Sequence, residues 1–225
     1  MTGRDANHGA CAQPCRWNYS LMEEKRPGQF FPVEEDGRGT YLYNSKEMCM
    51  IEHVPELIKA GITSFKIEGR NKTAYYAACV TDAYRAAIDT YKKDPENFVL
   101  PQFCRDEVNK VSHREYYTGF YFGNQENGQH YGDSQYIRDY EVVGMPVDCR
   151  EDGTAVFALK NRFFKGEELE LLQPGHAPYS FHAEAVNDDG EALDLFNVPQ
   201  MKVHFQFPFS VDRYAILRKK KERPE

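Results

Sequence analysis

The sequence predicts an α/β segment followed by an all-β segment, and two observations support this. Between residues 45 and 93, two runs with helical periodicity flank a short apolar stretch, residues 61–67, with β-branched members and bounding glycines. From about residue 135 onward, apolar residues recur with period two between hairpin signals. Helix, buried strand and helix form the repeating unit of parallel-sheet folds. Short alternating strands are typical of small antiparallel barrels or sandwiches.

In the α/β segment, a first helix is expected over residues 45–60. Pro55 should break or kink it, and Gly61 should end it. The stretch 61–67 reads as a buried strand. The long helix that follows is expected over residues 73–93, with Thr73 as a candidate N-cap and Asp94-Pro95 after its end. Residues 96–134 look like a connector with one short helix near 105–112.

The all-β segment contains several strand candidates separated by turn signals. Glu151-Asp-Gly153 and Asp188-Asp-Gly190 are hairpin signals. The expected strands cover residues 140–149, 154–159, 168–172, 181–186, 201–207 and 214–217. The chain therefore divides into residues 1–95, a connector over 96–134, and a β domain over 135–225.

Composition and charge narrow the class of protein. The 225 residues are 41% hydrophobic and 28% charged, which is typical of a globular protein. No apolar run approaches the ~20 residues that cross a membrane. The net charge of −7 argues against a protein that coats nucleic acid generally. One basic run, residues 218–223, reads as a solvated terminus, with RNA contact as the alternative.

The six cysteines are too few for a disulfide scaffold in a chain of this length. Without a secretory signal they predict reduced thiols and a cytoplasmic location. Cys11 and Cys15 lie four apart in a loop that contains glycine and proline, so their thiolates could converge on one metal ion, and Cys49 is the nearest further ligand. The alternative is that these cysteines are small buried apolar residues. Cys79, Cys104 and Cys149 are interpreted as structural.

Three charged residues, Lys66, Glu68 and Arg70, lie at or just past the end of the expected strand 61–67. Ligands of parallel α/β folds collect at this end of the strands. Lys66 and Glu68 are two apart and should point to the same side of the strand. The trio could bind an anion or act in acid–base catalysis, or it could form an ion-pair network that closes the fold.

Arg16, Trp17 and Tyr19 place a cation beside two aromatic rings. Such groups stack on nucleobases. They also anchor loops by ordinary burial, which is the more common role.

Several motifs resemble one known family. They are Gly3-Arg-Asp-Ala-Asn-His-Gly-Ala-Cys11, Cys15-Arg-Trp-Asn-Tyr19, Ser45-Lys-Glu-Met-Cys-Met-Ile51, Pro55-Glu-Leu-Ile-Lys-Ala-Gly-Ile62 and Ser64-Phe-Lys-Ile-Glu-Gly-Arg70. Together they resemble the second half of the collagenase-like peptidase family U-32, over about residues 3–93. The β-rich remainder is similar to that family's C-terminal domain.

The resemblance implies the C-terminal part of a modified (β/α)8 barrel followed by a small antiparallel β-barrel domain. The chain is then expected to begin inside the barrel. The resemblance also implies an iron–sulfur cluster of the 4Fe-4S type, with Cys11 and Cys49 as ligands and further ligands upstream, and it leaves the role of Cys15 open. The complete family member should be an enzyme, and this partial chain should be inactive alone.

The family branch most similar to these motifs hydroxylates a uridine at the wobble position of tRNA, with prephenate as a proposed partner metabolite. The expected partners are therefore tRNA and a small anionic metabolite that Lys66, Glu68 and Arg70 would suit. No membrane partner is expected. Self-association into a homo-oligomer is expected, because a partial barrel leaves strand edges unpaired.

Two other readings remain. One is a collagenase-like peptidase, as the family name states, although the sequence shows no serine or cysteine nucleophile with a convincing histidine partner. The other is a non-catalytic binding or assembly module.

Overall fold

The computed structural model describes most of the chain as two compact units. Unit 1 comprises residues 1–50, 68–73 and 113–137, and unit 2 comprises residues 51–67, 74–112 and 138–225. The residues whose structure is described are 4–5, 8–14, 17, 19–22, 27–28, 46–123 and 136–221.

Unit 1 contains a short parallel strand pair. Strand β1 (Glu47–Met48) lies beside β2 (Tyr116–Tyr117). The backbone N–H of Cys49 extends this pairing by donating to the Tyr117 carbonyl at 2.9 Å. Cys49 is therefore held in position by a strand ladder and not by a helix.

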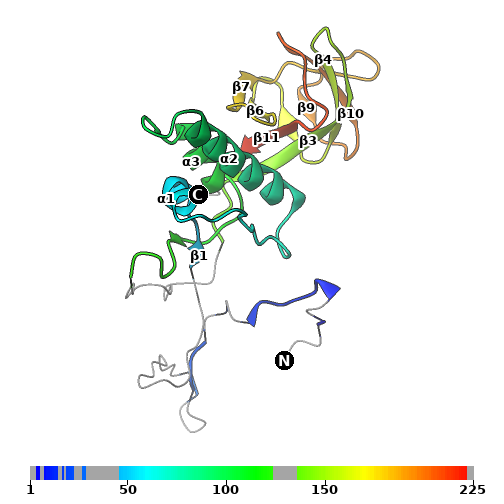
Figure 1. The fold of residues 1–225 in the computed structure, drawn as a ribbon. Coiled ribbons are helices and arrows are strands. Elements are labelled where there is room, and N and C mark those ends of the chain that lie inside the picture. Colours follow the sequence, from blue (N-terminus) through cyan, green and yellow to red (C-terminus); the bar gives the residue numbers. More distant parts are fainter. Residues whose placement is uncertain are drawn as a thin grey trace. The chain divides into compact units, whose positions relative to one another are not determined.

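The helices of unit 2 are η3 (Ile51–His53), α1 (Val54–Lys59), α2 (Ala74–Lys93) and α3 (Gln102–Asn109). In α2 the buried side chains recur at intervals of one, three or four residues, which places them on one face of the helix. They are Cys79, Val80, Ala83, Ala87 and Tyr91. Figure 1 shows α2 and α3 side by side. No helix within the described ranges is long and apolar enough to span a membrane.

The rest of unit 2 is a curled antiparallel sheet of seven strands in the order β7-β6-β11-β3-β4-β10-β8 (Figure 1). Strands β5 and β9 form a separate two-stranded sheet in unit 2. Their bounds are β3 (Tyr140–Cys149), β4 (Thr154–Leu159), β5 (Phe163–Phe164), β6 (Glu168–Leu172), β7 (Tyr179–His182), β8 (Val186–Asn187), β9 (Leu195–Phe196), β10 (Lys202–Gln206) and β11 (Ile216–Lys220).

Two apolar clusters stabilise unit 2. The larger one is aromatic and lies within the sheet, where the buried Phe163 and Phe196 rings stack at 4.7 Å and Phe157 meets Phe205 edge-on at 5.8 Å. The smaller one joins α2 to the sheet through Cys79, Val80, Val111, Leu172 and Ile216. Because this second cluster is buried, the helices and the sheet form one packed body.

The sequence predicts the long helix and the longest strands well. The helix over 73–93 and the strands over 140–149, 154–159 and 168–172 are confirmed. The candidate over 181–186 is replaced by two strands, β7 and β8, and the short β5-β9 pair was not anticipated. The connector helix begins earlier than expected, at Gln102.

Two expectations for the α/β segment are wrong. Residues 47–48 form a strand, and the helix begins only at Val54, because Pro55 fits the first turn of a helix and starts this one instead of breaking it. Residues 62–69 form no strand, and Ile62 is exposed. An apolar stretch becomes a strand only where a neighbouring strand accepts its hydrogen bonds. The described residues show no (β/α)8 barrel.

Candidate functional site

The candidate site residues are distributed unevenly between the two units. Unit 1 contains Cys11, Trp17, Tyr19, Cys49, Glu68 and Arg70, whereas Lys66 belongs to unit 2. Cys15 and Arg16 lie outside the described residues. The structure therefore gathers most of the proposed metal, anion and base-stacking groups in one compact body.

Within unit 1, residues 68–73 form a turn that carries Glu68 and Arg70. The Arg70 backbone N–H donates to Glu68 Oε1 at 2.9 Å, and the Lys72 N–H donates to the Gly69 carbonyl at 2.9 Å. The side chains of Lys66, Glu68 and Arg70 are all exposed. This exposure argues against the expectation that the three residues form a buried ion-pair network.

The same turn contacts the surroundings of Cys11 and Cys49, the two cysteines of unit 1 that the structure describes. Asn71 Nδ2 donates to the Cys11 carbonyl at 3.3 Å. Lys72 Nζ forms an ion pair with Glu47 Oε1 at 2.6 Å, two residues before Cys49. The turn thus links the chain segments that carry Cys11 and Cys49, which are 38 positions apart in the sequence.

The Lys72–Glu47 pair belongs to a partly buried polar group that sequence reasoning missed. The Lys72 ammonium lies 4.5 Å from the centre of the Tyr136 ring, and the Arg114 guanidinium lies 5.5 Å from the same ring. The Tyr136 hydroxyl donates to Gln13 Oε1 at 2.8 Å, close to Cys11. No motif spacing marks these five residues, because they lie far apart in the sequence, between positions 13 and 136.

Trp17 and Tyr19 are directed back onto their own loop. Trp17 Nε1 donates to the Ala12 carbonyl at 3.0 Å, and the Tyr19 hydroxyl donates to the Pro14 carbonyl at 2.9 Å. Their ring centroids are 6.0 Å apart. These contacts anchor the Cys11 loop, and the 37% exposure of Trp17 still leaves part of its ring open to a ligand.

The chemistry of an iron–sulfur cluster can be tested against the thiols of unit 1. Cys11 and Cys49 are free cysteines of intermediate exposure, and thiolates are the ligands that such clusters use. The described part of the chain contains no group of three or more His, Cys, Asp or Glu that could hold a metal ion. Cys11 and Cys49 are thus donors of the chemical type that such a cluster uses, and a set of four ligands would need further residues.

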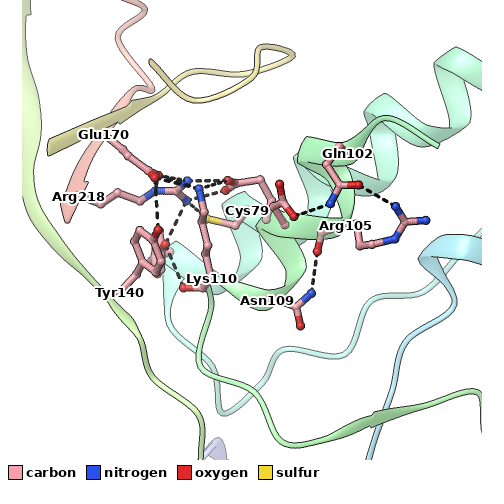
Figure 2. A network of polar contacts seen from close by, with 11 residues as sticks. Cys79, Gln102, Arg105, Asn109, Lys110, Tyr140, Glu170 and Arg218 are labelled. Carbon is pink, nitrogen blue, oxygen red and sulfur yellow. Dashed lines mark hydrogen bonds and ion pairs between the residues drawn. The ribbon is translucent and has the colours of Figure 1, made fainter. Parts of the chain in front are cut away.

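A second polar centre lies in unit 2, where Arg218 of β11 is fully buried (Figure 2). Its guanidinium donates to both oxygens of Glu107 on α3 at 2.5 and 2.6 Å, and to Glu170 Oε2 on β6 at 2.7 and 2.9 Å. Lys110 donates to both oxygens of Glu170 at 3.0 Å. Every oxygen of the two carboxylates thus accepts at least one charged hydrogen bond.

The ionisation of this centre follows from its burial and charges. Burial disfavours the charged form of Arg218, but hydrogen bonding to Glu107 and the nearby negative charges outweigh it and raise the pKa of the guanidinium. Burial would raise the pKa of Glu170, yet Arg218 and Lys110 hold it below its ordinary value. Burial also raises the pKa of Tyr140 to about 12. Arg218 and Glu170 therefore remain ionised at neutral pH, and the Tyr140 hydroxyl keeps its proton.

This network changes the interpretation of the basic run 218–223. Arg218 is fully buried, and Lys219 is nearly so, with its Nζ 2.8 Å from Glu167 Oε1. The reading of these two residues as a solvated terminus is wrong, and neither side chain is available to RNA. The physical reason is that both cations neutralise carboxylates inside unit 2.

The cysteines of unit 2 are poorly suited to chemistry. Burial raises the pKa of Cys79 to about 12 and that of Cys104 to about 11, and it also raises the pKa of Cys149. The thiolate is the nucleophilic form, so these thiols are unreactive at neutral pH. The interpretation of Cys79, Cys104 and Cys149 as structural residues agrees with these raised pKa values.

Comparison with known proteins identifies the family. The model of peptidase family U32 matches residues 1–131, and the model of the peptidase family U32 C-terminal domain matches residues 138–218. The tRNA hydroxylation protein P1 of Bacillus subtilis (strain 168) is 33% identical over 224 residues, which cover 98% of this chain and 53% of that protein.

Of two further relatives, one is again named a tRNA hydroxylation protein and the other is named a collagenase. The tRNA hydroxylation protein P of Escherichia coli (strain K12) is 30% identical over 265 residues, covering 95% of this chain and 56% of that protein. A protein of Porphyromonas gingivalis named collagenase is 28% identical over 173 residues, covering 75% of this chain and 46% of that protein. The chain spans about half the length of these curated relatives. Because the first family model matches more than half of the residues of this chain, the chain belongs to peptidase family U32.

Proposed function

We propose that this chain is part of a protein that hydroxylates a uridine of tRNA, at the wobble position, in the cytoplasm. Relatives at 27–33% identity, which match between 88% and 98% of the chain, are named tRNA hydroxylation proteins. The observation that carries the proposal is the turn 68–73, which contacts the segments of both Cys11 and Cys49 and presents Glu68 and Arg70 to solvent. The catalytic part of the complete protein would be the family's barrel.

In this proposal Cys11 and Cys49 are two ligands of an iron–sulfur cluster, and Cys15 is a further candidate. A bound cluster supplies one-electron chemistry. Asn71 and Lys72 position the two cysteine segments through the Cys11 carbonyl and Glu47. The exposed Arg70 guanidinium would bind the carboxylate of a small anionic metabolite such as prephenate.

The remaining groups would contact the RNA. The open part of the Trp17 ring would stack on a base, with Tyr19 and Arg16 beside it. Glu68 is fixed by the Arg70 backbone N–H and would accept a proton or hydrogen bond from the substrate. The C-terminal sheet would supply further tRNA contacts.

A peptidase is the second candidate, favoured by the relative named collagenase. The raised pKa values of Cys79, Cys104 and Cys149 argue against a cysteine nucleophile in unit 2. Two results would favour the peptidase. The purified complete protein would cleave gelatin in the presence of a metal chelator, and deletion of its gene would leave the hydroxyuridine content of tRNA unchanged.

The decisive experiment measures iron and acid-labile sulfide in the complete protein purified without oxygen. Cys11→Ser and Cys49→Ser should each lower both contents severalfold and remove hydroxyuridine from tRNA in a deletion strain. Cys149→Ser is the matched control, because its thiol has the same intermediate exposure but lies in unit 2. Equal loss of iron in all three variants, or iron retained in the first two, would refute the cluster assignment.

A further inference from the structure

The connection between β4 and β6, a turn that includes the short strand β5, is held by four hydrogen bonds, one of them from Lys219 of the C-terminal basic run. Glu167 accepts from Lys219 Nζ at 2.8 Å through Oε1, and from the Phe164 backbone N–H at 2.8 Å through Oε2. The Lys165 N–H donates to the Asp194 carbonyl at 3.0 Å, and the Gly166 N–H donates to the Ala183 carbonyl at 2.8 Å. These four hydrogen bonds fix the backbone of residues 164–167.

The same turn presents three cations to solvent. Lys160, Arg162 and Lys165 are exposed, and none makes an ion pair with a residue that the structure describes. The Glu167 carboxylate, which would otherwise attract them, has both oxygens occupied. In a chain with a net charge of −7, residues 160–165, here named the basic turn, therefore gather three exposed cations that no described carboxylate pairs.

An aromatic ring lies between these cations. Phe163 is fully buried against Phe196, whereas the next ring, Phe164, is 49% exposed. Lys165 also lines a groove of about 530 Å³ whose walls include Thr154, Glu184, His204 and Gln206. A ring of this exposure offers a face for stacking, and the adjacent cations can contact phosphates.

We propose that the basic turn is an RNA contact surface, in which Lys160, Arg162 and Lys165 bind phosphates and Phe164 stacks on an unpaired base. This inference rests on the proposed function, because it takes tRNA as the ligand. RNA is favoured over an anionic membrane, since the surface has one exposed ring on a fixed turn and lacks a broad apolar face. One exposed aromatic ring with cations before and after it in the sequence matches the way single-stranded RNA is bound.

The test uses the full 225-residue chain and an unmodified tRNA transcript, with binding followed by fluorescence anisotropy. The triple variant K160Q/R162Q/K165Q should weaken binding by about tenfold or more. The slope of log K against log salt should fall by about 2 to 3. The matched control, K59Q/K92Q/K93Q, removes three exposed lysines of unit 2 and should change binding little.

Phe164 is tested separately. Phe164→Leu should weaken binding by about fivefold or more, while Phe164→Tyr should retain it, because only an aromatic face stacks on a base. Circular dichroism of each variant should match the wild type. Equal losses in the target and control triples, no loss in either, or tighter binding to phosphatidylserine vesicles than to tRNA would each overturn the inference. If the complete wild-type protein binds tRNA through this surface but does not hydroxylate it, the proposed function is refuted and the RNA contact surface is not.

Discussion

Arg218 and Glu107 form a fully buried, two-fold hydrogen-bonded ion pair between strand β11 and helix α3. Two guanidinium nitrogens lie 2.5 and 2.6 Å from the two carboxylate oxygens, although the residues are 111 positions apart. Both side chains are at most 1% exposed. Since neither charge can be hydrated, each requires the other, and the pair fixes how the helices of unit 2 meet the sheet.

Breaking this pair should be strongly destabilising. Glu107→Gln leaves the Arg218 charge buried with an incomplete partner set, which should cost about 3–5 kcal/mol in the free energy of unfolding. The double variant Glu107→Leu with Arg218→Met should recover part of this loss, because two apolar side chains of similar size need no partners. Urea unfolding of the three proteins provides the measurement.

Arg85→Met is the matched control for the buried pair. Arg85 and Asp89 form an exposed ion pair on α2, and removing it should cost at most about 0.5 kcal/mol. If Glu107→Gln and Arg85→Met cost the same, the buried pair does not have the role given to it here.

Glu170 should make stability depend on pH on the acid side. Its pKa is held below the ordinary value of 4.5 in the folded protein by Arg218 and Lys110, against the opposing effect of burial. The stabilisation is therefore complete above pH 4.5 and is lost as the pH falls through the lower folded-state pKa. Between pH 6 and 3, the free energy of unfolding should fall more steeply for the wild type than for Glu170→Gln. Parallel curves would contradict this assignment.

The Arg218 centre also shows what the sequence could and could not predict. The strands around it follow from period-two alternation, and α2 follows from helical spacing, so local pattern was enough for both. The pairing of Arg218 with Glu107 depends on how a connector helix meets a strand 111 residues later. A run of Arg and Lys reads as solvated unless that packing is known, and only the structure shows which two cations are inside.

The proposed site in unit 1 was only partly predictable, because local sequence pattern marks some of its residues and not others. Motifs marked Cys11, Cys49, Glu68 and Arg70, and the structure places all four in one unit. Lys72 carries no motif, yet its ion pair with Glu47 links the turn 68–73 to the segment of Cys49. Burial of a charge depends on partners distant in sequence, so local pattern alone does not reveal it.

Gly153 should be the least replaceable residue of the β3–β4 hairpin. Its φ is +87°, and a Cβ at this position would lie 2.1 Å from the Phe207 carbonyl oxygen. Gly153→Ala therefore combines left-handed strain with a clash against backbone, and we expect a loss of more than about 2 kcal/mol. Thermal unfolding measures it.

Gly190→Ala is the control for the hairpin, because Gly190 has a similar φ of +80° but nothing within 4 Å of the added Cβ. Only the left-handed strain applies there, so the cost should be about 1 kcal/mol. A Gly153→Ala variant as stable as Gly190→Ala would mean that the Phe207 backbone, directly after β10, moves away freely.

Glu68 and Arg70 test the anion and substrate site of the proposed function. Both side chains are exposed, so Glu68→Gln and Arg70→Ala should leave the melting temperature nearly unchanged. If they act on substrate, each should abolish tRNA hydroxylation in the complete protein. Glu52→Gln and Arg105→Ala are the matched control, because they alter an exposed ion pair of the same types in unit 2. Should all four variants retain activity, or should activity fall only with stability, residues 68–70 have no direct part in the reaction.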